Sequence, residues 1–391
     1  MNRTTMQSFK VTRTLIVSSL LITGLLSGRA VPASTSSGSF TLTGSLNIAR
    51  YNHTATLLPS GEVLVTGGLG VNGVYTSLAS AELYDPKKEK WTMTGSMSVG
   101  RTAFTATLLA NGEVLVAGGS DYQISCYATA ELYNPSTSQW RLTSSMNQPR
   151  CLHSATLLPN GEVLVSGGVN SIYDTNTATV SGAEIYNPQT GTWKTTGSLN
   201  VSRADAATSL LQNGQVLTAA GYNNTGNNNP NTYLTSAELY DPSTGQWRFT
   251  GSISGTVGLP TNPVILTNGD VLIAGFAQFF VPNTGSWAAT GALPTLTGPP
   301  TKAALLGNGN ALGTGGECKS TKYYSCGFAP TNVAYLYSFA GNSWSQTGSM
   351  NYGRFYHTMT LLPSGEVLVT GGVEGKSAYR TVLSKTELYT P

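Results

Sequence analysis

Short apolar runs alternate with polar, glycine-rich turns along most of this chain. Residues 61–68 read GEVLVTGG, and the same phrase, a polar-Gly turn, an apolar run and usually a Gly pair, occurs seven times. The copies begin at Gly61, Gly112, Gly161, Gly214, Gly269, Gly309 and Gly365. Because neighbouring copies are 40 to 56 residues apart, the chain is predicted to be a repeat protein.

Each copy is followed by an aromatic residue and, seven positions later, by a Trp. These pairs are Tyr84 and Trp91, Tyr133 and Trp140, Tyr186 and Trp193, Tyr240 and Trp247, Phe280 and Trp287, and Tyr337 and Trp344. The seventh copy has Tyr389 but no Trp segment. Residues 40–46 (FTLTGSL) match residues 91–97 (WTMTGSM), so the strand around Phe40 is expected to complete the seventh unit. A ring closed in this way leaves no long exposed sheet edge.

Four short strands are predicted in each unit. In the third unit they cover residues 153–158, 163–166, 183–186 and 193–195. β-branched, aliphatic and aromatic residues dominate the strands, and Gly, Pro, Asn and Asp dominate the gaps. No helical periodicity of useful length follows residue 30, so the rest of the chain is predicted to be all-β.

A Gly pair after an apolar strand, with a spaced Tyr and Trp, resembles the kelch motif, and the resemblance spans residues 40–391. It implies a seven-bladed β-propeller of the kelch, or galactose-oxidase-like, superfamily. We expect one domain over residues 34–391. Its blades are expected at about 50–97, 101–146, 150–199, 203–253, 256–293, 298–350 and 354–391 plus 38–46. The Gly pair is broken at Ala220 in the fourth blade and at Phe276 in the fifth, so these two blades should be less regular.

The N-terminus has the pattern of a bacterial-type secretory signal. Arg3, Lys10 and Arg13 precede an apolar stretch over residues 15–26, which is followed by a small-residue cleavage site near Ala33. We therefore expect residues 1–33 to be removed and the protein to be secreted, periplasmic or on the cell surface, with no membrane span after cleavage. Without them the chain has 17 basic and 18 acidic residues, which argues against nucleic acid as a partner.

Four cysteines in an exported chain allow three pairings. Cys126 lies in the loop after the second strand of the second unit, and Cys151 lies just before the first strand of the third unit. These connections emerge on the same face of a propeller, so we expect disulfides Cys126–Cys151 and Cys318–Cys326. Free, partly buried thiols are the alternative.

An Arg column and a Glu column run through the repeat in register. Both are absent from the fifth and sixth units, which carry Gly258 and Gly298 in the Arg column and Gln278 and Tyr335 in the Glu column. Because the columns vanish together, we infer contact within each blade, with geometry suited to a bidentate guanidinium. The expected structural pairs are Arg50–Glu82, Arg101–Glu131, Arg150–Glu184, Arg203–Glu238 and Arg354–Glu387.

All three histidines, His53, His153 and His357, occupy one repeat position. Three imidazoles around a channel would suggest a metal site. We instead expect each His to be a repeat residue that bonds within its own blade, and we expect no metal.

Tyr356 and His357 resemble the Tyr-His segment that supplies copper ligands in galactose and glyoxal oxidases, so the resemblance implies them as ligands of a copper radical oxidase. That family also needs a second Tyr, cross-linked to a Cys, in the column of Tyr356, and a further His from another domain. The column reads Asn52, Ala103, Leu152, Asp205, Pro260 and Pro300, with Cys151 one residue out of line. The incomplete set favours a protein without copper. Other acid-base chemistry would fall to the loop carboxylates Asp121, Asp174, Asp205, Glu317 and Glu374.

The loops after the second strands vary most and carry nine of the nineteen tyrosines. These are Tyr75, Tyr122, Tyr127, Tyr173, Tyr222, Tyr233, Tyr323, Tyr324 and Tyr379. Tyr offers flat apolar area with a hydroxyl, and Asn in the same loops offers adaptable hydrogen bonds, which suits sugars or extended polypeptides. The alternative is that these are ordinary polar loops, in which the Tyr side chains pack over the residues beneath them.

These features predict an exported propeller that acts as a non-catalytic binding module and needs no cofactor. The expected partner is extracellular carbohydrate, slightly ahead of protein, bound by the loop tyrosines. The alternative class is an enzyme, either a copper radical oxidase or another carbohydrate-active propeller. We expect a monomer.

Overall fold

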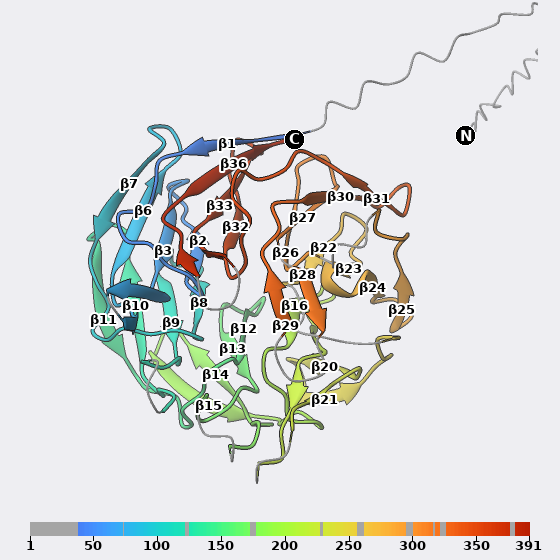
Figure 1. Ribbon diagram of the computed structural model, residues 1–391. Coiled ribbons are helices and arrows are strands. Elements are labelled where there is room, and N and C mark those ends of the chain that lie inside the picture. Colours follow the sequence, from blue (N-terminus) through green and yellow to red (C-terminus); the bar gives the residue numbers. More distant parts are fainter. Residues whose placement is uncertain are drawn as a thin grey trace, which may run out of the picture. The chain divides into compact units, whose positions relative to one another are not determined.

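Every predicted unit forms a four-stranded antiparallel sheet, or blade, and in six of the seven blades the strands follow one another in chain order. The structure, a computed structural model, describes residues 38–72, 74–121, 125–172, 177–226, 230–255, 262–294, 300–315, 317–320, 326–375 and 380–391. The blades belong to one unit, Ser37–Pro391. Figure 1 shows them around a common centre, with the first strand of each blade innermost.

The first four blades have regular strands. Blade one contains β2 (Thr54–Leu57), β3 (Val63–Thr66), β6 (Ala81–Asp85) and β7 (Lys90–Thr94). Blade two contains β8 (Thr105–Leu108), β9 (Val114–Ala117), β10 (Ala130–Asn134) and β11 (Gln139–Thr143). Blade three contains β12 (Ser154–Leu157), β13 (Val163–Ser166), β14 (Ala183–Asn187) and β15 (Thr192–Thr196). Blade four contains β16 (Ala207–Leu210), β17 (Val216–Ala219), β20 (Ala237–Asp241) and β21 (Gln246–Phe249).

The remaining blades complete the ring. Blade five contains β22 (Val264–Ile265), β23 (Val271–Ile273), β24 (Gln278–Val281) and β25 (Ser286–Ala289). Blade six contains β26 (Lys302–Leu305), β27 (Ala311–Thr314), β30 (Ala334–Ser338) and β31 (Ser343–Gln346). Blade seven contains β32 (Thr358–Leu361), β33 (Val367–Thr370), β36 (Thr386–Thr390) and the N-terminal strand β1 (Ser39–Thr43). Blade five has short strands, as expected. The same expectation was wrong for blade four, which keeps full-length strands because Ala220 adopts the positive φ of 57° that the Gly of other blades supplies.

The apolar runs form the second strand of each blade. All four residues of β3 are buried, because neighbouring blades cover both faces of this strand. A strand covered on both sides reads as a continuous apolar run, whereas the outer strand β7 mixes buried and exposed positions. The hydrophobic core therefore lies between blades rather than within one sheet.

The Tyr and Trp columns join each blade to the preceding one. The Tyr84 hydroxyl bonds to the Thr43 Oγ1 at 2.7 Å, and Trp91 Nε1 donates to the Gly44 carbonyl at 2.9 Å. The two rings pack with centroids 5.0 Å apart. Equivalent Trp bonds to the preceding blade recur at Trp140, Trp193, Trp247, Trp287 and Trp344.

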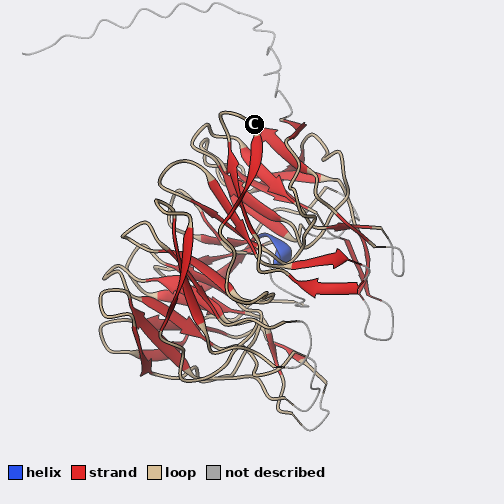
Figure 2. Ribbon diagram, turned by 90° about the vertical axis from the view of Figure 1, so that its left-hand side faces the viewer, coloured by secondary structure: helices blue, strands red, loops and turns tan. Residues whose placement is uncertain are grey.

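Loops after the second strands extend the blades on one face. Four of them contain small hairpins, formed by β4 (Leu69–Asn72) with β5 (Val74–Ser77), β18 (Tyr222–Asn223) with β19 (Thr232–Tyr233), β28 (Glu317–Ser320) with β29 (Cys326–Ala329), and β34 (Val373–Glu374) with β35 (Thr381–Val382). In blade five a single helical turn, η1 (Ala274–Phe276), replaces the loop and is blue in Figure 2. Within the described ranges no helix is long and apolar enough to cross a bilayer.

The ring closes where β1 pairs with β36, with Phe40 opposite Tyr389. Phe40 is buried against the core between blades six and seven. We expect Phe40→Ala to lower the free energy of unfolding by about 3 kcal/mol, because it leaves a cavity at the closure. Urea denaturation would measure the loss. Thr41→Ala, on the exposed side of the same strand, is the control, and equal stabilities of the two variants would contradict this account of closure.

Candidate functional site

The five arginines of the Arg column hold the bases of the loops that follow the second strands. Arg50 is fully buried, and its Nη1 donates to the carbonyl of Gly67 at 3.0 Å and to that of Ser80 at 2.9 Å. These two residues begin and end the loop after β3. The Arg50 Nη2 donates to the Glu82 Oε1 at 2.9 Å. One guanidinium therefore fixes both ends of the loop to the blade that carries it.

The carboxylate of each pair is also fully engaged. Glu82 Oε2 accepts from the backbone N and the side-chain Nδ2 of Asn47, at 2.7 and 2.8 Å, and Oε1 accepts from the Ile48 amide at 3.1 Å. Because Nη1 is taken by the carbonyls, the expected bidentate contact is wrong and the guanidinium meets only one carboxylate oxygen. Asn47 begins a column that sequence reasoning missed, which continues in Asn147, Asn200 and Asn351, with Ser98 in blade two.

All five expected pairs lie in contact. The nitrogen–oxygen distances are 2.9 Å for Arg50–Glu82, 2.6 Å for Arg101–Glu131, 2.8 Å for Arg150–Glu184, 2.9 Å for Arg203–Glu238 and 2.5 Å for Arg354–Glu387. In blade five, Gln278 replaces the Glu and exchanges hydrogen bonds with Ser254 instead. A neutral amide in the Glu column needs no buried cation beside it. A blade that lacks the Glu can therefore lack the Arg as well.

The histidines join blades, which corrects the expectation that each bonds within its own blade. His53 Nε2 lies 3.0 Å from Thr358 Oγ1 of blade seven, and His153 Nε2 lies 3.0 Å from Thr105 Oγ1 of blade two. His357 Nε2 lies 2.8 Å from Thr314 Oγ1 of blade six. Each His precedes an inner strand, so its side chain reaches the inner end of the preceding blade. Burial lowers the pKa of His153 to about 3, and the nearby Arg150 charge acts in the same direction.

A disulfide joins Cys126 and Cys151, whose Cα atoms lie 5.5 Å apart. It fastens the loop of blade two to the segment before β12 of blade three. The backbone of Cys126 also bonds to the Asn170 carbonyl at 3.0 Å, in the neighbouring loop. The side chains of Cys318 and Cys326 lie outside the described residues, so their disulfide stays a prediction.

The groups around Tyr356 and His357 differ from the copper donors that the oxidase resemblance implies. The His357 side chain is buried, with its Nε2 directed at Thr314, and Cys151 is held in the disulfide. Cys151 therefore has no thiol to cross-link a Tyr. Among the described residues, no group of three or more His, Cys, Asp or Glu side chains is placed to hold a metal ion. The donors present do not fit copper.

The column of Tyr356 instead lines the centre of the loop face. Its members Asn52, Leu152, Asp205 and Tyr356 share a positive φ of 51° to 57°. Backbone bonds link neighbours around the ring, from the Asn52 amide to the Tyr356 carbonyl at 3.1 Å and from the Asp205 amide to the Leu152 carbonyl at 2.8 Å. The described members of this column therefore follow part of the ring at the loop-face end of the inner strands.

We call four side chains the axial cluster because the charge of Asp205 affects the pKa of each of the other three: Asp205, Tyr222, Lys302 and Tyr356. Burial raises the pKa of Asp205 and lowers that of Lys302, and the attraction between the two charges opposes both shifts. Burial, then the charge of Asp205, raises the pKa of Tyr222 to about 12, so its hydroxyl stays protonated. Burial raises the pKa of Tyr356 as well, against the effect of Arg380. Asp205 and Lys302 both remain partly exposed.

The structure separates the nine predicted loop tyrosines into different roles. Tyr127 lies against Arg101, whose guanidinium carbon is 5.6 Å from the ring centroid, so it covers the Arg–Glu pair. Tyr222 and Tyr233 face each other across the β18–β19 hairpin, and Tyr233 is 45% exposed. Tyr75 lies in β5, where only the backbone is described. Tyr122, Tyr173, Tyr323, Tyr324 and Tyr379 lie outside the described residues.

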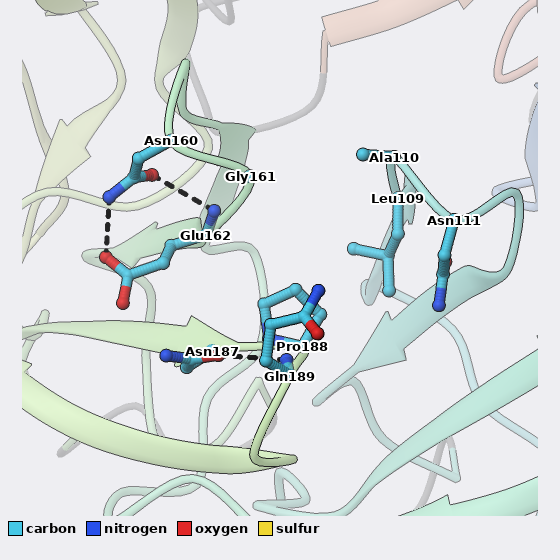
Figure 3. Close-up of a pocket in the computed structure, with 9 residues that line it drawn as sticks. All are labelled: Leu109, Ala110, Asn111, Asn160, Gly161, Glu162, Asn187, Pro188 and Gln189. Carbon is cyan, nitrogen blue, oxygen red and sulfur yellow. Dashed lines mark hydrogen bonds between the residues drawn. The ribbon is translucent and has the colours of Figure 1, made fainter.

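A pocket of about 290 Å³ lies on the opposite face, between turns of blades two and three (Figure 3). Its polar groups hold those turns: Asn160 Nδ2 donates to Glu162 Oε2 at 2.8 Å, and the Gln189 amide donates to Asn187 Oδ1 at 2.9 Å. Glu162 also pairs with Lys194 at 3.3 Å. The polar groups that line the pocket are therefore explained by their role in holding the turns.

Comparison with known proteins identifies related sequences and folds. The sequence model of the family described as "Kelch motif" matches residues 49–98, 101–147, 149–200 and 206–252, which together make up half of the chain. Kelch-like protein 23 of Mus musculus is 29% identical over 205 residues, covering 52% of this chain and 33% of the mouse protein. The chain thus spans about a third of that relative.

A solved fungal alcohol oxidase of the AA5 family, in complex with copper, has a similar fold. The TM-score is 0.66 at 16% identity, over 91% of this chain and 76% of the oxidase chain. At this identity the likeness concerns the fold alone. The family matches cover blades one to four, whereas blades five and six lack the Arg and Glu columns and blade seven is divided between the chain ends.

The buried pairs should control stability rather than binding. We expect Glu184→Ala to lower the free energy of unfolding by about 3–5 kcal/mol, because Arg150 would keep a buried, unpaired charge. Urea denaturation would measure this loss. The exposed pair partner Lys194→Ala is the control, with an expected effect under about 1 kcal/mol. Equal stability of Glu184→Ala and the parent would contradict the structural role of the pair.

The same pair should make stability depend on pH. Burial alone would raise the pKa of Glu184, but hydrogen bonds from Asn147 and Arg150 outweigh it and hold the pKa below its ordinary value. The resulting stabilisation is therefore present above the unfolded-state pKa and is lost as the pH falls through the folded-state pKa. Chemical denaturation across this acidic range should show the parent and Glu184→Gln converging in stability, and a constant difference would contradict the assignment.

Proposed function

Because the chain belongs to the kelch-repeat family of β-propellers, we propose that it is an exported, non-catalytic binding module whose loop face binds extracellular carbohydrate. The observation that carries this proposal is the axial cluster, a group of partly exposed polar and aromatic side chains at the centre of a face whose loops are fixed at their bases. Ligand sites commonly combine a rigid scaffold with a few convergent polar groups.

The chemistry around the cluster favours a sugar. Tyr233 is exposed beside Tyr222. The charge of Asp205 helps to raise the pKa of Tyr222. A flat ring can cover the apolar face of a pyranose, while a carboxylate and phenol hydroxyls bond to its hydroxyl groups. An extended polypeptide is the second candidate, since the same groups also bind peptide amides.

Export is supported by two features. The N-terminal segment has the pattern of a secretory signal, and the Cys126–Cys151 disulfide is of a kind that persists mainly in oxidising compartments. Catalysis through copper is disfavoured by the donor set, since Cys151 is bonded to Cys126 and the His357 Nε2 is directed at Thr314. A binding module needs neither group.

Carbohydrate binding can be tested with purified residues 34–391 on an array of polysaccharides and glycans, with copper present and absent. We expect retention on a glycan without copper-dependent peroxide release. Tyr233→Ala should weaken that binding roughly tenfold, because it removes exposed aromatic area from the site. Phe249→Ala is the matched control, since Phe249 is an exposed aromatic on the outer strand of the same blade.

Three results would contradict the proposal. Peroxide release that requires copper and is lost in Tyr356→Phe would favour the oxidase class. Absence of retention on any glycan, together with binding to an extracellular polypeptide, would favour a protein partner. Equal binding by Tyr233→Ala and Phe249→Ala would show that the β18–β19 hairpin is not part of the binding site.

A further inference from the structure

Asp205, two residues before β16, and Lys302, the first residue of β26, place opposite charges at the ends of two inner strands without forming a direct pair. Among the residues that the structure describes, no hydrogen bond or ion pair within 4 Å involves either side chain. The five Arg–Glu pairs of the blades, by contrast, close at 2.9 Å or less. A charge surrounded by protein and left without a hydrogen-bonded partner is costly, so these two groups are unlike the structural pairs.

The repeat shows that the fold does not require Lys302. It occupies the first position of an inner strand, and the equivalent positions of the other blades hold Thr54, Thr105, Ser154, Ala207, Asn262 and Thr358. Thr105 and Thr358 bind the His of the following blade there. With Lys302 in this position, His357 binds Thr314 on the next strand instead. The interblade contact of His357 has therefore moved to the Thr314 hydroxyl, and a charged residue occupies the position that holds Thr in three other blades.

Asp205 is the matching exception in the column two positions earlier in the repeat. Asn52, Ala103, Leu152, Pro300 and Tyr356 occupy the other described equivalent positions, so Asp205 alone in the described part of this column carries a charge. Asn52 adopts the same φ of 51°, which shows that an amide fits this backbone. The acid and the base thus come from blades four and six, each replacing a neutral residue that the frame accepts.

We propose that the axial cluster is a subsite for an acidic sugar, in which Lys302 binds the carboxylate of a uronic acid residue and Asp205 accepts hydrogen bonds from its hydroxyl groups. This inference rests on the proposed function, which it narrows to a class of glycan. A uronate has an anionic group at one edge of the ring and hydroxyl donors at the others. It can therefore satisfy a cation and an anion that do not contact each other, while Tyr222 and Tyr356 supply ring surface and hydroxyls beside it.

The test compares the full mature chain with two variants that borrow residues from its own repeat. Lys302→Thr takes the residue of blades one, two and seven, and Asp205→Asn takes that of blade one, so both are expected to fold normally. Binding of a galacturonate trimer and of its methyl-esterified, uncharged form would be measured by calorimetry. Lys90→Thr, which removes an exposed Lys from the outer strand β7, controls for net charge.

We expect Lys302→Thr to weaken binding of the charged trimer about tenfold or more, as for the loss of a charged hydrogen bond, and to leave the esterified trimer unaffected. Asp205→Asn should weaken both, and Lys90→Thr neither. Equal affinity for the two trimers, or an unchanged affinity in Lys302→Thr, would overturn the acidic-sugar assignment while glycan binding stands. Binding of neutral glycans without binding of the charged trimer would also overturn the acidic-sugar assignment. Failure to bind any glycan would overturn the proposed function as well.

Discussion

The buried guanidinium–carboxylate pair is the interaction on which the loop face depends. In blade one it joins the segment before the first strand, through Asn47 and Ile48, to both ends of the loop, through Gly67 and Ser80. Burying two charges brings little net stability by itself, but removing one partner is expensive. Its main effect is therefore geometric: loops of very different length begin and end at the same places in five blades.

Between blades the contacts are of another kind. Tyr hydroxyls, Trp indoles and His imidazoles bond to groups of the preceding blade, as Tyr84 does to Thr43, Trp91 to Gly44 and His53 to Thr358. These bonds surround a core of buried aliphatic side chains that also lies between the sheets. A chain of such contacts gains most when it closes on itself, because no blade then exposes its apolar face. The pairing of β1 with β36 provides that closure.

The sequence predicted what is periodic and local. The strands, the blade count, the closing segment, the partners of Arg50 and the other column arginines, and the neighbourhood of Cys126 and Cys151 all follow from positions in one repeat. The His partners were mispredicted because a column gives the position of a residue but not whether its side chain turns toward its own blade or the preceding one. Lys302 was not predicted as a site residue because it does not recur in the other repeats. Its signal was the reverse, a single charge in a column of hydroxyl and other small neutral residues.

In a repeat protein, residues that recur belong to the scaffold, whereas single exceptions to the repeat indicate a ligand site. A residue present in most blades must serve what the blades share, which is packing and closure, so the Arg, Glu, Tyr, Trp and His columns are explained by the frame. A ligand on the axis meets all seven blades at once and is not itself sevenfold symmetric. Groups that recognise it must therefore break the repeat. Asp205 and Lys302 do so in the two columns that flank the His column, with opposite charge, at positions where other blades show that neutral residues suffice. Because the frame gains nothing evident from either charge, recognition at the axis is the simplest physical reason for the pair.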